Sequence, residues 1–247
     1  MQKTISNLKG YTLGASDGDI GSVDDFLFDD DYWTIRNLVA DTRKWLPGRR
    51  VLISPIALGK IDRQSKRVTV SLSKDQVRHS PGIDGGSFSR EREIEYYDYY
   101  RWPYYWVGGD VWGAGVYPGS LAAAQKMAID SEQQKDGASV LRSAKELRGY
   151  YLEALNGEIG HVDDFIIDDE TWEIRYIVVD TQNWWPGKKV LVSPDWIDRI
   201  SWSDCIVYVD LSREAIKTGP EFDAEELSRD YEESLYEHYG RPRYWHL

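Results

Sequence analysis

One stretch of this chain occurs twice, and its two copies lie 139 positions apart. Residues 20–42 and 159–181 share the run Ile-Gly-x-Val-Asp-Asp-Phe, followed at equal spacing by Asp-Asp, Trp-x-Ile-Arg and Asp-Thr. When residues 5–84 are set against 144–223, about 34 of 80 positions are identical without a gap. Self-similarity at one fixed spacing is the signature of an internal duplication. The sequence therefore predicts two copies of one structural unit.

Turn signals divide each copy into short β-strands. Asp17-Gly18 and Asn156-Gly157 are dipeptides typical of tight hairpin turns. Ser-Pro at 54–55 ends a further segment, and residues 68–72 alternate apolar and polar side chains as a half-buried strand does. Strands this short, separated by turns about every 8–12 residues, favour a small closed barrel over a parallel sheet with crossover helices. The predicted fold class is mainly β, with two tandem small barrels.

Each copy is also expected to end in a short helix and an aromatic tail. Ser73 is a good N-cap for a helix over residues 74–79. Residues 88–97 and 224–236 are charged and favour helix. Each is followed by a terminus rich in tyrosine, tryptophan and proline that keeps the spacing of 139.

The segment between the copies has no counterpart. Its glycines predict a linker with one helix over residues 120–128. The predicted domains are a first barrel (1–84), a helical and aromatic tail (85–106), a glycine-rich linker with a short helix (107–139), a second barrel (140–223) and a second helical and aromatic tail (224–247).

Composition narrows the class of protein. Hydrophobic residues make up 41% of the 247 positions and include 11 tryptophans, which is enough for packed cores, so a disordered chain is not expected. No apolar run approaches the ~20 residues of a membrane span. The first copy begins almost directly after Met1, so we expect no cleaved targeting segment and a cytoplasmic protein. The single cysteine, Cys205, forms no internal disulfide. Because it lies where the second copy enters a β-like run, it is expected to be a buried structural thiol.

Charge is spread unevenly along a chain whose net charge is −12. Residues 1–84 hold 13 Lys+Arg against 11 Asp+Glu, whereas residues 140–223 hold 9 against 17. An acidic protein is disfavoured as a general nucleic-acid binder, since that role needs a basic surface. The asymmetry suggests the hypothesis that the copies have diverged in what they face, which includes each other.

Several of these runs resemble a known family. Leu-x-Gly-Tyr at 8–11, Gly-x-Ile-Gly-x-Val-Asp-Asp-Phe at 18–26, Trp-x-Ile-Arg at 33–36, Val-Leu-Ile-Ser-Pro at 51–55 and Val-x-Val-x-Leu at 68–72 are similar to the PRC-barrel domain. That domain forms the cytoplasmic part of the photosynthetic reaction centre H subunit and the C-terminal domain of the ribosome maturation factor. The resemblance covers both copies, about two thirds of the chain.

The resemblance implies a small β-barrel that serves as a protein-interaction or scaffold module and has no common catalytic residues. The chain departs from both relatives, since its sequence lacks the transmembrane helix of the H subunit and the RNA-processing-type domain of the maturation factor. It looks most like stand-alone, duplicated PRC-barrel proteins of bacteria. Two alternatives follow by analogy: a ribosome- or RNA-processing-associated adaptor, and an assembly factor for a photosynthetic electron-transport complex.

Two acidic clusters are candidate sites. Asp24-Asp25 and Asp163-Asp164 are neighbours on strands, so their side chains point to opposite faces and cannot share a proton. We expect them at a bulge, with one carboxylate accepting backbone N–H groups. Asp29, Asp30 and Asp31 gather three carboxylates in one turn and are weak candidates for Ca²⁺ or Mg²⁺. A solvated turn is the preferred interpretation, because no EF-hand spacing surrounds them.

Catalytic chemistry finds no support in the spacing of residues. The four histidines lack ligand spacing, and none pairs with the cysteine. The glycines at 108–115 are not flanked by a strand and a helix, as a nucleotide loop requires. Because no acid–base pair, nucleophile or metal set can be assembled, we predict no enzyme, no metal and no cofactor.

The candidate interaction residues are aromatic and basic: Trp45, Trp184 and Trp185 in loops beside Pro-Gly, and Arg49 and Arg50 directly after it. Exposed tryptophans are common anchors of protein interfaces, and the loop tryptophans are left open between interface and core. The arginines suit phosphate or RNA, but solvent-facing charge that protects a strand end is the preferred interpretation. The aromatic tails are expected to fold back over a barrel, because their apolar area would otherwise promote aggregation.

Together these features predict a non-catalytic, cytoplasmic module that presents rigid barrel faces and loop tryptophans to a protein partner. The copies are expected to pack with pseudo-twofold symmetry, or two chains do so as a homodimer. Membrane insertion is not expected, and nucleic acid is disfavoured as a partner. Both alternative functions rest on fold analogy.

Overall fold

The computed structural model describes residues 2–42, 45–47, 49–82, 88–113, 115–124, 140–181, 188–224 and 227–246. This described chain divides into two compact units. We name the first unit as Ile5–Lys145 with Asp168–Glu173, and the second unit as Gln2–Thr4 with Glu146–Ile167 and Ile174–Leu247. Both units consist mainly of β-strands, as predicted.

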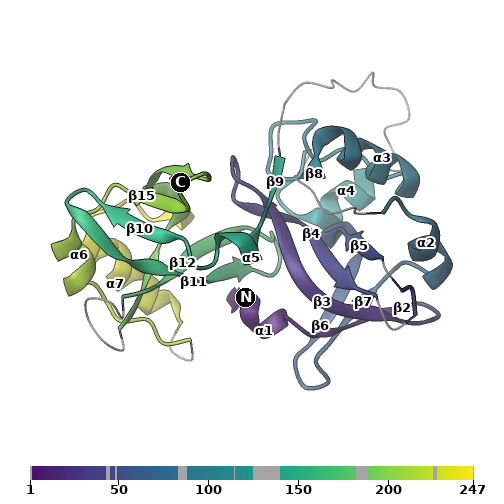
Figure 1. Ribbon diagram of the computed structural model, residues 1–247, viewed down its shortest axis with the longest axis horizontal. Helices are drawn as coiled ribbons and strands as arrows, with labels where there is room; N and C mark the ends of the chain where they lie inside the picture. The colour runs from purple at the N-terminus through teal and green to yellow at the C-terminus, as the bar shows by residue number, and fades with distance from the viewer. Residues whose placement is uncertain are drawn as a thin grey trace. The chain divides into compact units, whose positions relative to one another are not determined.

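Among the described residues, the first unit carries an eight-stranded sheet. Its strands are β2 (Thr12–Ala15), β3 (Gly18–Asp29), β4 (Thr34–Asp41), β5 (Arg50–Ile53), β6 (Leu58–Asp62), β7 (Arg67–Val70), β8 (Phe88–Ser89) and β9 (Val140–Ser143). The main path runs β5-β4-β3-β2-β7-β6, and β9 pairs with both β3 and β8. The β2–β7 pair is parallel, whereas the other pairs of the path are antiparallel. In Figure 1, β3 and β4 are neighbouring strands of this unit.

Short helices complete the first unit. They are α1 (Ile5–Leu8), the 3₁₀ turn η1 (Pro55–Ala57), α2 (Lys74–His79), α3 (Arg90–Tyr100) and α4 (Pro118–Ala124). The predicted helix after Ser73 is confirmed: the Ser73 hydroxyl accepts from the backbone N of Gln76, and the Gln76 side chain accepts from the backbone N of Ser73. This reciprocal pairing satisfies two donors that the start of a helix would otherwise leave unpaired.

Over the described part of the chain, the second unit carries a seven-stranded sheet with the equivalent order, β13-β12-β11-β10-β15-β14, and β1 pairs with β11. Its strands are β1 (Gln2–Thr4), β10 (Tyr151–Ala154), β11 (Gly157–Asp168), β12 (Ile174–Asp180), β13 (Lys189–Val192), β14 (Ile197–Ser201) and β15 (Ile206–Val209). Its helices are η2 (Pro194–Trp196), α6 (Arg213–Thr218), α7 (Arg229–Tyr239) and η3 (Tyr244–His246), and α5 (Ala144–Leu147) lies where the chain enters it. The two repeats therefore adopt the same strand order, and the expected closure of each sheet into a barrel stays a prediction.

The expected bulge at the paired aspartates is confirmed in both units. The β3–β4 register shifts between Val23 and Asp25, and the β11–β12 register shifts at the equivalent place. Asp25 Oδ1 accepts from the backbone N of Phe26 at 2.7 Å and from that of Lys145 at 3.0 Å. Asp164 Oδ1 accepts from the next backbone N at 2.9 Å. These carboxylates accept hydrogen bonds from backbone N–H groups at the point where the bulge interrupts the pairing of the two strands.

Each unit includes the strand that begins the other repeat. β1 pairs with β11 of the second unit, whereas β9, its counterpart at the spacing of 139, pairs with β3 of the first unit. Gln2 adds a side-chain bond, with Nε2 donating to Glu232 Oε1 at 2.6 Å. The predicted domain boundaries stay a prediction.

Both aromatic tails fold back onto their own units, as expected. In the first unit the Tyr96 hydroxyl donates to the carbonyl oxygen of Leu52 in β5, and Tyr96 is 1% exposed. In the second unit the ring of Tyr236 packs against Trp196 with centroids 5.4 Å apart. The rings of Tyr96 and Tyr236 are thereby removed from water.

One expectation about the core is wrong. Cys205 is exposed, not buried. It occupies the turn between β14 and β15 with a φ of 58°, so its side chain projects from a tight turn and not from the strand. Within the described residues, no helix combines the length and hydropathy needed to cross a membrane.

Candidate functional site

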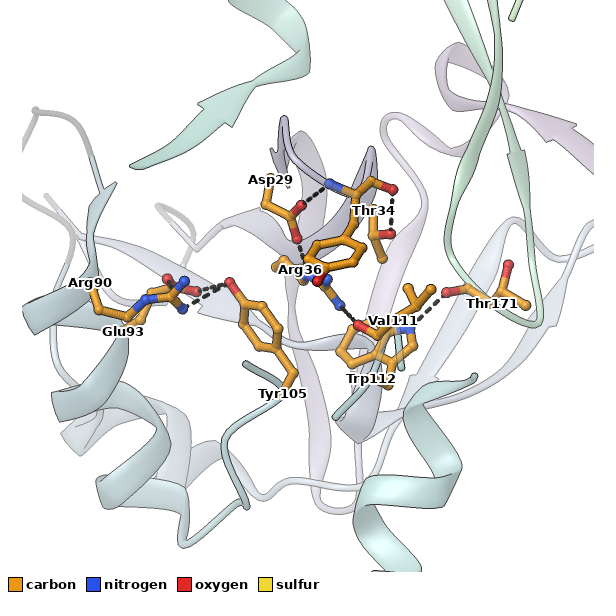
Figure 2. A network of polar contacts seen from close by, with 10 residues as sticks. Asp29, Thr34, Arg36, Arg90, Glu93, Tyr105, Val111, Trp112 and Thr171 are labelled. Atoms are coloured by element: carbon orange, nitrogen blue, oxygen red, sulfur yellow. Dashed lines mark hydrogen bonds and ion pairs between the residues drawn. The ribbon is translucent and has the colours of Figure 1, made fainter. Parts of the chain in front are cut away.

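A buried arginine organises the polar interior of the first unit. Arg36 lies on β4, where every residue from Thr34 to Ala40 is buried, and it is itself 0% exposed. Its Nε donates to the carboxylate of Asp29 at the end of β3, and its Nη1 donates to the carbonyl oxygen of Val111 at 2.6 Å (Figure 2). A charge is tolerated in such a place only when it is paired and hydrogen-bonded.

Two aromatic rings complete the surroundings of Arg36. Its Cζ lies 3.9 Å from the ring centroid of Tyr105 and 4.7 Å from that of Trp112. Trp112 is fully buried, and its Nε1 donates to the carbonyl oxygen of Thr171 at 2.7 Å (Figure 2). The guanidinium is therefore held by carboxylate, carbonyl and π faces together.

A second buried carboxylate ties the tail to helix α3. Glu93 is 0% exposed and accepts from Arg90 Nη1 and from the hydroxyl of Tyr105, both at 2.9 Å. Arg90 Cζ also lies 4.1 Å from the ring centroid of Trp106. Because Tyr105 contacts both Arg36 and Glu93, the tail, helix α3 and strand β4 share one polar network (Figure 2).

Burial perturbs the two carboxyl groups of this network. Desolvation raises the pKa of Glu93 to about 7, although Arg90 and the Tyr105 hydroxyl oppose the shift. Desolvation likewise raises the pKa of Asp29, against the charge of Arg36 and the bond from the backbone N of Tyr32. Carboxyl groups with shifted pKa values occur both in active sites and in structural ion-pair networks. Each of these two has its hydrogen-bond partners within the fold, so the network fits a structural role.

The second unit repeats the network at the spacing of 139. Glu232 is 3% exposed and pairs with Arg229 at 3.1 Å. It accepts from the hydroxyl of Tyr244 at 3.0 Å and from the hydroxyl of Tyr176 at 2.8 Å. Arg175, the counterpart of Arg36, lies with its Cζ 4.5 Å from the ring centroid of Tyr244. The arrangement therefore belongs to the repeated unit.

One substitution separates the two networks. Asn37 stands where the second unit has Tyr176, whose hydroxyl reaches Glu232. Asn37 is 0% exposed, and neither of its side-chain polar atoms has a hydrogen-bond partner within the described residues. The shorter side chain thus leaves Glu93 without the phenol that its counterpart receives.

A small pocket opens beside the Arg36 network. Its volume is about 70 Å³, and Asp29, Arg36 and Tyr105 form part of its wall. The remaining wall includes the exposed residues Asp31 and Asp110. The predicted acidic turn therefore borders a cavity, which sequence spacing does not show.

The predicted interaction residues of the first unit have structural contacts. Trp45 is half-buried, and its Nε1 donates to the carbonyl oxygen of Ile20 at 2.6 Å. The guanidinium of Arg49 donates to the carbonyl oxygens of Arg78 and Ser80, where α2 ends. Cations are favourable at helix C-termini, so Arg49 caps α2. Arg50 begins β5 and is exposed.

The same cap recurs in the second unit, where Lys188 Nζ donates to the carbonyl oxygen of Gly219 at 2.8 Å at the end of α6. Trp184 and Trp185 lie outside the described residues. Their proposed role in an interface, and that of Trp45, stays a prediction.

The three aspartates of the acidic turn have different environments. Asp29 is buried with Arg36, Asp30 lies 3.4 Å from Arg142 Nε, and Asp31 is exposed. Within the described residues, no group of three or more His, Cys, Asp or Glu side chains is arranged to hold a metal ion. The buried carboxylate of the three, Asp29, therefore already faces a cation of its own chain.

Sequence reasoning missed the centre of this site. The signal for Arg36 and Glu93 was present, since both recur at the spacing of 139 as Arg175 and Glu232. An arginine within an apolar strand pattern also indicates a buried ion pair. Trp112 had no such signal, because residues 107–139 have no repeated counterpart.

Comparison with known protein families gives a match in the second repeat. The family model of the PRC-barrel domain matches residues 142–216. These residues begin in β9 and end in α6, so they include all strands from β10 to β15. No curated protein matches the chain.

Proposed function

We propose that the chain is a cytoplasmic protein-interaction scaffold, because residues 142–216 match the family model of the PRC-barrel domain, a non-catalytic domain family. Its first repeat is, in this proposal, a second copy of the same domain. The shared strand order of the two units supports this, as does the identity of about 34 of 80 aligned positions.

One observation carries the proposal: the buried ionisable groups of both units hold the fold together. Glu93 and Glu232 each bind an arginine and a tail tyrosine of their own unit. The pocket in the first unit has about 70 Å³, whereas small-molecule sites usually have about 300–1,000 Å³. These features support a rigid platform for a macromolecule.

Exposed apolar side chains offer places for a partner. In the first unit, Tyr32 is 58% exposed and Tyr117 51% exposed. In the second unit, Tyr151 is 50% exposed and Leu155 70% exposed. Tyrosines at interface centres often supply much of the binding energy. We expect a partner bound through the first unit to cover Tyr32 or Tyr117, and one bound through the second unit to cover Tyr151 or Leu155.

A capture experiment tests the proposal. The tagged full chain is incubated with native lysate, crosslinked briefly and analysed by mass spectrometry. We expect one or a few enriched proteins that are lost with Tyr32→Ser/Tyr117→Ser or with Tyr151→Ser/Leu155→Ser, each pair being the control for the other. The idea fails if no protein is enriched over a bait-free control, or if enrichment ignores both pairs. Ribosomal proteins or photosynthetic complexes among the captured proteins would select one of the narrower alternatives.

A further inference from the structure

The pocket of the first unit has an excess of negative charge at its mouth. Two arginines in its wall, Arg36 and Arg90, are already engaged by Asp29 and Glu93 respectively. Asp31 and Asp110 also line the pocket, and both are exposed. Within the described residues neither forms an ion pair with a cationic side chain. The negative charge of Asp31 also reaches the buried Asp29, because it contributes to the raised pKa of that carboxyl group. The mouth therefore favours a cation.

Aromatic rings line the same pocket. Tyr32, Tyr105 and Trp106 are part of its wall, and Tyr32 is 58% exposed. The unit already binds cations in this way: Arg36 lies 3.9 Å from the ring centroid of Tyr105, and Arg90 lies 4.1 Å from that of Trp106. A carboxylate together with a π face is the environment in which ammonium and guanidinium groups bind best.

The size of the pocket limits the occupant. Its volume of about 70 Å³ is several times smaller than the roughly 300–1,000 Å³ usual for small-molecule sites, so only a small group enters it. A nucleotide or an organic cofactor needs several times this space. The occupant is thus the tip of a longer molecule that stays outside.

We propose that this pocket receives the ammonium end of a lysine side chain from the protein partner, with Asp31 and Asp110 as counter-charges and Tyr32 and Trp106 as walls. This inference rests on the proposed function, because it names the chemistry that the interaction module recognises. Asp110 lies in the stretch 107–139, which has no repeated counterpart, so this part of the pocket wall is not repeated in the sequence of the second copy. The two copies of the domain therefore differ in what they bind.

The test uses the full chain and the peptide Gly-Gly-Lys-Gly-Gly with blocked ends, followed by ¹H–¹⁵N NMR at low salt. We expect shifts at Asp31, Tyr32, Gly108 and Asp110 that saturate, and none of them with the Nε-acetylated peptide, which lacks the charge. An arginine peptide should bind more weakly than the lysine peptide, because its guanidinium is larger. Added salt should weaken binding, since exposed charges are screened.

Charge variants decide the outcome. Asp31→Asn/Asp110→Asn should weaken binding roughly ten-fold, whereas Asp198→Asn/Asp204→Asn, which removes two exposed acids of the second unit, should leave it unchanged. The substituted side chains are exposed, so we expect the spectrum of the fold to be preserved. Equal binding by both variants, or shifts spread over many acidic residues, would overturn the proposal.

The capture experiment separates this proposal from the proposed function. If partners are captured and Asp31→Asn/Asp110→Asn retains them all, the lysine pocket is refuted and the interaction module stands. If no partner is captured, the module is refuted, and the peptide titration still judges the pocket by itself.

Discussion

Replacing Arg36 with methionine tests whether the buried ion pair organises the first unit. The side chains of Arg36 and Asp29 are 1% and 3% exposed. Methionine keeps much of the apolar length but leaves the Asp29 carboxylate without its cation. Breaking a buried pair on one side costs about 3–5 kcal/mol, and loss of the cation–π contacts at 3.9 and 4.7 Å adds about 1 kcal/mol. We expect a loss of about 4–6 kcal/mol at pH 7.

Hydrogen exchange is the appropriate assay, because a chain of two units has no single free energy of unfolding. Peptides from β4 report the first unit, and peptides from β12 report the second. A loss of about 4 kcal/mol accelerates exchange in β4 about a thousand-fold, since about 1.4 kcal/mol corresponds to a factor of ten. Exchange in β12 should change little.

The matched control is Arg175→Met in the second unit. Arg175 is half-buried with its Cζ 4.5 Å from the ring centroid of Tyr244, and we expect a cost of about 1 kcal/mol. The double variant Asp29→Asn/Arg36→Met removes the unpaired buried carboxylate and should recover part of the stability lost in Arg36→Met. Protonation of Asp29, whose pKa burial already raises, should make the single variant milder at pH 5 than at pH 7. Equal losses for Arg36→Met and Arg175→Met, or a double variant no better than the single one, would refute the reasoning.

Three further predictions concern titration, strand exchange and backbone packing. The raised pKa of Glu93, about 7 against a usual 4.5, means that the folded chain holds this proton more tightly than the unfolded chain. The stability of the first unit should therefore fall as pH rises from about 4.5 to 7, by up to about 3 kcal/mol. Opening free energies from hydrogen exchange in β4 should show this slope reduced in Glu93→Gln, and an unchanged slope would contradict it. Deleting residues 2–4 removes β1 and the hydrogen bond from Gln2 to Glu232. Hydrogen exchange should therefore accelerate in β11 and not in β4. Acceleration confined to β4 would show that β1 stabilises its own repeat. A Cβ at Gly21 or Gly160 would lie 2.1 Å from the carbonyl oxygen of Asp41 or Asp180. Hydrogen exchange in β4 for Gly21→Ala, and in β12 for Gly160→Ala, should therefore show a loss of about 2–4 kcal/mol. Gly109→Ala, whose Cβ meets nothing within 4 Å, should be neutral.

Local signals predicted most of the elements. The Asp17-Gly18 turn joins β2 to β3, and Gly18 has a φ of 132°, which a tight turn favours in glycine. The helix after Ser73 and the bulge at Asp25 follow equally from neighbouring residues. Such features depend on hydrogen bonds between groups a few residues apart, so their causes lie in short stretches of sequence.

The site was less predictable, because its contacts join distant residues. Arg36 meets Val111 across 75 positions, and Trp112 meets Thr171 across 59. The spacing of 139 identifies Arg36 and Glu93 as shared by both copies, but it does not say that they are buried or which groups they face. Burial is a property of the packed unit, and the same burial raises the pKa of Glu93.

The sequence by itself determined that one structural unit occurs twice, that it is mainly β and where its turns lie, because repetition and turn chemistry are written in adjacent residues. Only the tertiary structure decided that β1 joins the second unit while β9 joins the first. Strands of three and four residues are too short for their sequence pattern to indicate which strand they pair with. Their pairing depends on backbone hydrogen bonds to the edges of β3 and β11, which are distant in the sequence.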